Sequence, residues 1–142
     1  MNSFTVKDIL DSIDDYLVTK EEVETFHKLI MKRQGEPARY INESHLDSAL
    51  GGIKTSLYYQ DETLDIITIA YLYAERVALA HAFVDGNKRA GYAAMKLFLA
   101  KLNKDLDMDS SEQADLMVNI TTKAYSQEHF IMEIKDCLYN LS

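Results

Sequence analysis

Residues 81–89 concentrate side chains that could carry out acid–base and anion chemistry. The segment reads His-Ala-Phe-Val-Asp-Gly-Asn-Lys-Arg, and the sequence on both sides of it is apolar. A turn between two buried helices rarely needs a base, a carboxylate, an amide and two cations. These residue types together indicate a site for a phosphate ester, its metal ion and a hydroxyl group that must lose a proton.

The two cations are the most specific part of this pattern. Lys88 and Arg89 fall in the first turn of the helix expected after the segment. The N–H groups at a helix N-terminus carry partial positive charge, which disfavours a cation there by a few tenths to about 1 kcal/mol. A bound anion would be attracted by the N–H groups and the cations alike. The pair therefore predicts a phosphate site.

The other polar residues of the segment suit the same ligand. Asp85 would be repelled by phosphate but can hold Mg²⁺, which prefers one or two carboxylates together with phosphate oxygens. Gly86 permits a close backbone approach and a positive φ, and Asn87 can donate an amide N–H to a phosphate oxygen. His81, one helical turn before Asp85, is the natural general base. Phe83 is expected to anchor the loop in the core. Each residue alone has an ordinary structural explanation, but their combination is typical of a functional site.

Composition excludes several classes of protein. The chain has 142 residues, a net charge of -8 and one cysteine, Cys137. Without an accumulation of basic residues, general nucleic-acid binding is not expected. No intrachain disulfide or thiolate zinc cluster can form, which fits a reducing cytoplasm. No apolar run has the length of a membrane span, and no leader sequence is recognisable, so a cytoplasmic protein is expected.

Apolar periodicity predicts helices along almost the whole chain. In the second of them, His27 is expected to lie at the surface or its boundary. The residues expected to face inward are Val23, Phe26, Leu29 and Ile30. The expected helices begin near Thr5, Thr19, Asn42 or Ser44, Asp61, Lys88, Ser110 and Ser126.

One segment is expected to be extended. Gly51 and Gly52 are expected to end the third helix, and residues 53–60, which follow them, are rich in β-forming residues. A flap or short hairpin is predicted there. The predicted fold is an all-α bundle with one short β feature.

Residues 81–89 resemble the signature of the Fic/Doc (Fido) family, His-x-Phe-x-Asp/Glu-Gly/Ala-Asn-Gly/Lys-Arg. Lys88, where many members have glycine, resembles the Doc branch, the death-on-curing toxins of prokaryotes and phages. The order and spacing of residues 19–35 and 41–50, and of the helix containing Asp115 and Leu116, also look Doc-like. The resemblance implies a Fido domain over residues 19–142, a helical bundle with a short β-hairpin flap. Residues 1–18 would be an N-terminal helical extension.

The resemblance also implies roles for individual residues. His81 matches the histidine that deprotonates the target hydroxyl, and Asp85 matches the acidic residue that positions Mg²⁺ with the phosphates of ATP. The positions that match the phosphate-binding loop are Gly86, Asn87, Lys88 and Arg89. The flap of such proteins docks an extended segment of the target by strand addition. Its counterpart here would be Ile53, Lys54, Thr55 and Ser56.

Two departures from the family pattern bear on the chemistry. Adenylylating members usually carry a second arginine three residues after the first, and this chain has Tyr92 there. Doc also lacks that arginine and resembles a kinase that phosphorylates a threonine of elongation factor Tu, so Tyr92 favours phosphoryl transfer. The Thr-Ala-Leu-Asn that often follows Arg89 in Doc is Ala-Gly-Tyr-Ala here, residues 90–93, which removes two polar groups.

A regulatory motif of the family can also be sought in the sequence. Many relatives carry an inhibitory Ser/Thr-x-x-x-Glu, but no glutamate of this chain has Ser or Thr four residues before it. An active toxin would then need an antitoxin on another chain, as Doc does.

Three functions follow from the sequence. The first is a Doc-like toxin of a toxin–antitoxin pair that uses ATP and Mg²⁺ to phosphorylate a protein such as elongation factor Tu and so blocks translation. The second is Fic-type protein adenylylation. The third is an inactive binding module with the same fold, which the intact His81 and Asp85 disfavour.

Overall fold

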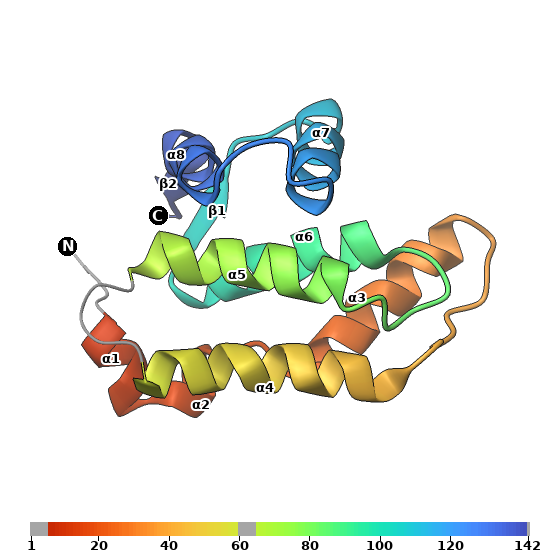
Figure 1. The fold of residues 1–142 in the computed structure, drawn as a ribbon, viewed down its shortest axis with the longest axis horizontal. Helices are drawn as coiled ribbons and strands as arrows, with labels where there is room; N and C mark the ends of the chain where they lie inside the picture. Colours follow the sequence, from red (N-terminus) through yellow and green to blue (C-terminus); the bar gives the residue numbers. More distant parts are fainter. Residues whose placement is uncertain (1–5, 60–64, 142) are drawn as a thin grey trace.

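The computed structural model describes residues 6–59 and 65–141, which form helices and one small sheet (Figure 1). The elements in chain order are α1 (Val6–Asp11), α2 (Ile13–Tyr16), α3 (Lys20–Arg33), α4 (Glu43–Tyr59), α5 (Ile66–Leu79), α6 (Asn87–Lys101), β1 (Lys104–Leu106), α7 (Ser110–Thr121), α8 (Gln127–Cys137) and β2 (Leu138–Asn140). The all-α bundle predicted from the sequence is confirmed, with a minor β component.

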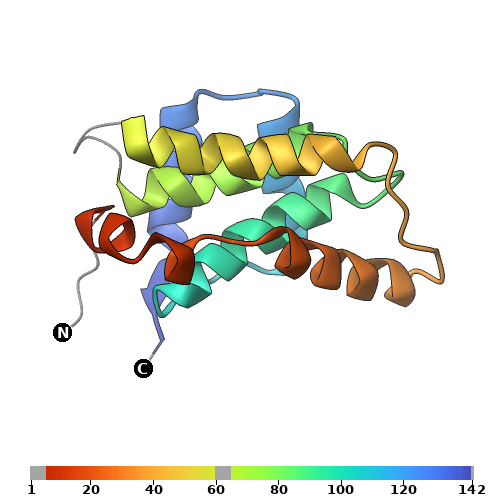
Figure 2. The same cartoon turned by 90° about the horizontal axis from the view of Figure 1, so that it is seen from below.

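Helices α5 and α6 form the centre of the bundle. In Figure 1, α7 and α8 cover one side of this pair and α4 covers the other, and Figure 2 shows α3 running beside α6. The central helices approach closely because Gly91 has no side chain. A Cβ atom added there would stand 2.5 Å from the Ala74 carbonyl oxygen and 2.9 Å from the Ala78 Cβ. The loop that joins α5 to α6 carries the motif, so this packing fixes both of its ends.

Most helix starts follow from capping chemistry. Thr19 and Glu22 form the predicted capping box of α3, and the Ser126 hydroxyl accepts the His129 N–H at the start of α8. The start predicted for α7 shifts by one residue, since Asp109 is its N-cap. The caps predicted at Thr5 and Asp61 lie outside the described residues. Helix α5 has Asp65 as its N-cap, with a carboxylate oxygen 2.8 Å from the Thr68 nitrogen.

The flap predicted over residues 53–60 is wrong for the part that the structure describes. Residues 53–59 are the last two turns of α4, which runs through Gly51 and Gly52 without a break. The reason is an apolar stripe at helical spacing that continues beyond the glycines. Its members, buried or half-buried, are Leu46, Leu50, Ile53 and Leu57. Burying this stripe outweighs the helix penalty of two glycines, about 1 kcal/mol each.

The sheet lies at a different place in the sequence. Strands β1 and β2 pair antiparallel, with Lys104 opposite Asn140 and Leu106 opposite Leu138. The Asp105 carboxylate forms an ion pair with Lys96 of α6, which ties the sheet to the central helix. None of the helices among the described residues is both long and apolar enough to cross a membrane.

Candidate active site

The motif loop lies between the end of α5 and the start of α6, and a second loop supports it. Backbone N–H groups of Ile41 and Asn42 donate to the Ala82 carbonyl at 2.7 and 3.0 Å, and the Val84 N–H donates to the Arg39 carbonyl at 3.0 Å. The α3–α4 connection thus holds the middle of the motif by strand-like pairing. Figures 1 and 2 show both loops at the same end of the molecule.

His81 has an unusual backbone conformation for its residue type. It follows the C-cap of α5 with φ = 50°, in the left-handed region that glycine normally occupies at a helix end. A Cβ in this conformation costs roughly 1–2 kcal/mol. Its side chain is exposed. Strain of this kind persists where the surroundings impose it, and it is concentrated at functional sites.

Asp85 and Gly86 form the turn into α6. An Asp85 carboxylate oxygen accepts the Gly86 N–H at 2.7 Å, and the Asp85 side chain is exposed. Gly86 has the positive φ expected from the sequence, 80°. The side on which its Cβ would stand faces α3, 3.0 Å from the Met31 sulfur and 3.2 Å from His27 Nε2. The close approach that requires glycine is therefore made to α3, whereas the sequence suggested an approach to a ligand.

Both polar atoms of the Asn87 side chain form hydrogen bonds within the loop. Its Oδ1 accepts the Phe83 N–H at 3.1 Å, and its Nδ2 donates to the Phe83 carbonyl at 3.0 Å. This pair of bonds closes the loop around Phe83, which is buried as predicted. The side chain thus holds the loop, and the Asn87 backbone N–H lies at the first position of α6.

The start of α6 fits an anion. Gly86 is its N-cap, and no side chain among the described residues accepts from its first-turn N–H groups, whereas α3, α5, α7 and α8 all begin with a capping side chain. Lys88 and Arg89 in this turn are exposed, and neither forms an ion pair with a carboxylate of residues 6–59 or 65–141. N–H donors and positive charge at the same place make this helix start suited to binding an anion.

His27 is the residue of this region that sequence reasoning missed. The side chain is 1% exposed, and its Nε2 lies 2.7 Å from the Asp85 carbonyl oxygen. Helix α3 buries Val23, His27 and Met31, whereas Phe26 and Leu29, predicted to face inward, are exposed. The signal available was the spacing of four residues between Val23, His27 and Met31, which defines one face of a helix.

Three rings stack where α3 meets the motif. The His27 and Phe83 rings are 3.7 Å apart at 15°, and the Phe83 and Tyr40 rings are 4.8 Å apart at 19°. The Tyr40 hydroxyl donates to Glu24 of α3 at 2.8 Å. Burial and this bond raise the pKa of Tyr40, so its hydroxyl stays a donor at neutral pH. The stack joins α3, the α3–α4 connection and the motif loop.

Tyr92 packs into the bundle one turn after Arg89. Its hydroxyl has no hydrogen-bond partner within the described part of the chain. Burial raises its pKa, and the nearby acidic groups of Asp105, Cys137 and Glu112 raise it further. The hydroxyl therefore stays neutral at ordinary pH, and the side chain supplies no positive charge at this position.

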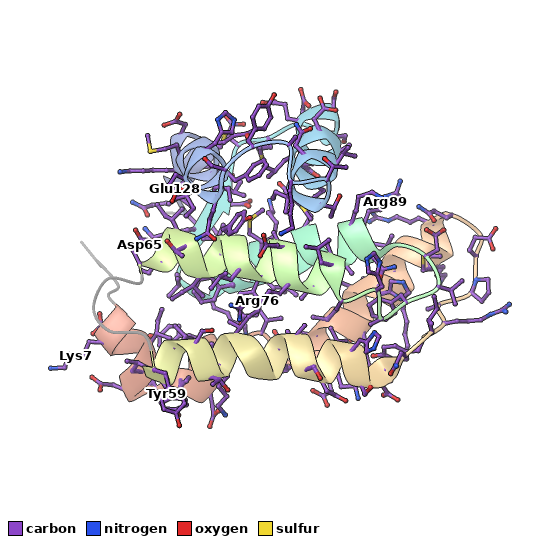
Figure 3. All side chains as sticks on the ribbon, viewed as in Figure 1. Lys7, Tyr59, Asp65, Arg76, Arg89 and Glu128 are labelled. Carbon is purple, nitrogen blue, oxygen red and sulfur yellow. The ribbon has the colours of Figure 1, made fainter. Side chains whose placement is uncertain are left out.

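The predicted docking residues lie away from the motif. Ile53 is fully buried, Lys54 forms an ion pair with Asp14 at 3.7 Å, and the Ser56 hydroxyl accepts from Arg76 at 3.2 Å. Thr55 is exposed on the same helix. Figure 3 shows Tyr59, at the end of α4, and Arg89 toward opposite ends of the molecule. Residues 53–56 thus form no flap beside the motif.

A cavity of about 240 Å³ lies between the α2–α3 connection and α4. Its lining includes Lys20, Asp47 and Lys54, and no residue of the motif. The motif side chains are by contrast displayed on an open surface, with His81, Asp85, Lys88 and Arg89 all exposed.

The part of the chain that contains the motif matches a family model. The model of the Fic/DOC family matches residues 17–99, more than half of the chain, including α3 to most of α6 with the whole motif loop. The chain belongs to the Fic/DOC family. No curated protein matches it. Enzymes of the Fic/DOC family generally transfer groups to protein hydroxyls with ATP as substrate and usually with Mg²⁺, which supports a transferase.

Proposed function

We propose that this Fic/DOC protein is a Doc-like toxin that transfers the γ-phosphoryl group of ATP to a threonine or serine hydroxyl of a target protein. The observation that carries the proposal is the start of α6, where the described residues provide neither a side-chain cap nor an ion-pair partner for Lys88 and Arg89. An exposed histidine and an exposed aspartate lie on the same loop. An anion site, a metal-binding carboxylate and a base on one loop are the parts that phosphoryl transfer needs.

Each residue has a distinct task in this reaction. His81 would accept the proton of the target hydroxyl as the oxygen attacks. Asp85 would hold Mg²⁺, which neutralises charge on the phosphates when it is bound. Lys88, Arg89 and the first-turn N–H groups of α6 would bind the phosphate oxygens. The Asn87 side chain would keep the loop closed. Because that side chain is bonded to Phe83, only the Asn87 backbone N–H would be left to donate to a phosphate oxygen.

Two features favour phosphoryl transfer over adenylylation. Tyr92 stands where adenylylating members carry a second arginine, and a phenol supplies no positive charge there. Lys88 is the residue of the Doc branch. The open position of the motif suits a hydroxyl on a protein surface, which is the acceptor in both reactions, and so does not separate them.

The proposed target is elongation factor Tu, and the proposed antitoxin is a separate chain. The test is intact-mass measurement of elongation factor Tu after incubation with ATP, Mg²⁺ and this protein, with His81→Ala in parallel. A phosphate-sized gain that is lost with His81→Ala is expected. An AMP-sized gain would contradict phosphoryl transfer and assign the chain to the adenylylating branch. No gain with elongation factor Tu or with lysate proteins would argue for an inactive binding module.

A further inference from the structure

The imidazole of His27 forms a hydrogen bond with the backbone of the motif loop. It comes from α3, 58 residues before Asp85 in the chain, and apart from tyrosines it is the one polar side chain in the buried core of the described residues. Burying a polar group is unfavourable unless it forms a hydrogen bond. The bond it forms, at 2.7 Å, is to the carbonyl oxygen of Asp85. Because a carbonyl only accepts, Nε2 must carry the proton.

The bond acts on the residue whose carboxylate faces the nucleotide site. Fixing the Asp85 carbonyl fixes the peptide plane between Asp85 and Gly86. The Gly86 N–H of that plane is in turn held by the Asp85 carboxylate at 2.7 Å. The direction of the carboxylate is thus connected through one peptide to the His27 ring.

The surroundings leave the ring little freedom. Phe83 stacks on it with a centroid distance of 3.7 Å, and a Cβ added at Gly86 would stand only 3.2 Å from Nε2. Met31, one turn further along α3, lies against the same glycine. A ring clamped between Phe83 and Gly86 can hold the loop in one position.

We propose that His27 is a positioning residue that holds the Asp85 carboxylate where Mg²⁺ and the phosphates require it. The proposal rests on the proposed function, since it gives Asp85 its metal-binding role. A purely structural role would need only an apolar side chain of similar volume at position 27. The positioning role requires, in addition, an N–H donor at Nε2 that bonds to the Asp85 carbonyl oxygen.

Three variants separate these roles. His27→Leu fills much of the space without a donor, and His27→Gln restores an N–H donor at comparable reach. Val23→Ala is the control, because Val23 is buried on the same face of α3, one turn earlier, and removing its methyl groups destabilises the core without touching the loop.

The activity test measures kcat and KM for ATP over a range of Mg²⁺ concentrations, at a temperature where each variant is folded. His27→Leu is expected to lower kcat about 10-fold or more, because small misplacements of reacting groups are costly, and to require more Mg²⁺. His27→Gln should recover most of this loss. Val23→Ala should stay within about twofold of the unmodified protein, on the same principle that an undisturbed loop keeps its geometry. Equal losses in His27→Leu and Val23→Ala, or no recovery in His27→Gln, would overturn the proposal.

A second measurement does not depend on activity. Nitrogen-15 NMR of the imidazole distinguishes a protonated Nε2 from an unprotonated one, and the expected result is a protonated Nε2 with a scalar coupling to the Asp85 carbonyl carbon. An unprotonated Nε2 would overturn the proposal. If the protein transfers nothing from ATP, the proposed function fails, and the Gly86 amide shift decides the positioning role. A shift displaced in His27→Leu and restored in His27→Gln supports it, and an unchanged shift refutes it.

Discussion

At the scale of single residues, the motif loop uses side chains in conformations that stability alone would not favour. His81 takes a left-handed backbone, Gly86 caps a helix without a side chain, and Lys88 and Arg89 add positive charge to the same helix end. These choices weaken the local fold and become favourable when an anion binds. The glycine and the two cations can be read from the sequence because they violate local rules, whereas the left-handed backbone of His81 was not predicted from it.

The strain at His81 makes stability and activity separable. His81→Gly and His81→Ala should both abolish transfer, since both remove the base. His81→Gly should be the more stable of the two by about 0.5–1 kcal/mol, because glycine tolerates φ = 50° and the gain is partly offset by its freer unfolded chain. Urea denaturation of the two variants measures the difference. A more stable alanine variant would mean that residue 81 is not left-handed.

The hydrogen-bond partners of Asn87 and His27 could not be predicted from the sequence, although the spacing of Val23, His27 and Met31 indicates that His27 is buried. An Asn-Lys-Arg at a helix start gives no indication that the amide is already bonded to Phe83. His27 becomes significant only when α3 is placed beside a loop 58 residues away. Local patterns identify candidate chemistry, whereas contacts between distant segments depend on tertiary packing.

At the scale of elements, capping chemistry was the reliable sequence signal and glycine was the unreliable one. The starts of α3 and α8 follow from Thr19 and Ser126. Gly51 and Gly52 suggested a helix end, but the apolar stripe on both sides of them keeps α4 continuous to Tyr59. A glycine ends a helix where the chain must turn, and at positions 51 and 52 packing against α5 favours continuation.

Gly91 has the opposite role, because its missing side chain lets α5 and α6 touch. Gly91→Ala should destabilise the protein by about 1–3 kcal/mol, since the new Cβ would meet the Ala74 carbonyl oxygen at 2.5 Å and the backbones must separate. Gly51→Ala is the matched control. Its Cβ would meet nothing within 4 Å, so helix propensity should raise stability by up to about 1 kcal/mol. Similar urea midpoints for the two variants would contradict this account of the α5–α6 contact.

The small sheet is attached to α6 through Asp105. Burial acts to raise the pKa of this carboxyl, but the Lys96 ammonium and the Leu106 N–H outweigh it and hold the pKa below its usual range. A lowered folded pKa gives stability that is present above the unfolded pKa of about 3.9 and is lost as pH falls through the folded value. Asp105→Asn should therefore lower the urea midpoint at pH 7, and the difference should shrink as pH falls below about 4.

The exposed Asp107 provides the control for that measurement. Its side chain forms no ion pair with the rest of residues 6–59 and 65–141, so Asp107→Asn should leave the urea midpoint nearly unchanged across the same pH range. A constant difference between Asp105→Asn and the unmodified protein from pH 7 to pH 3 would show that the ion pair with Lys96 does not carry the effect.

At the scale of the whole molecule, the proposed function requires a chain with a net charge of -8 to bind a polyanionic nucleotide. The general field opposes this, but charges beyond about 10 Å are screened at 0.1 M salt, whereas Lys88, Arg89 and the N–H groups of α6 would touch the phosphates. A negatively charged bundle could therefore still bind an anion locally, because the start of α6 and its two cations lie together at one end of the molecule, where Figure 3 shows Arg89.

Nucleotide binding at that end should stabilise the fold by linkage. With Mg²⁺ present, ATP at one hundred times its Kd adds about 2.7 kcal/mol, which should raise the Tm by several degrees at this chain length. Arg89→Ala should lose most of the rise measured by thermal denaturation in 0.15 M salt. Lys135→Ala removes an exposed cation of α8 outside the motif and should keep the rise. An equal rise in Arg89→Ala and the unmodified protein would place ATP elsewhere, with the cavity lined by Lys20 and Lys54 as the alternative to test, because its cations would then have to supply the binding charge.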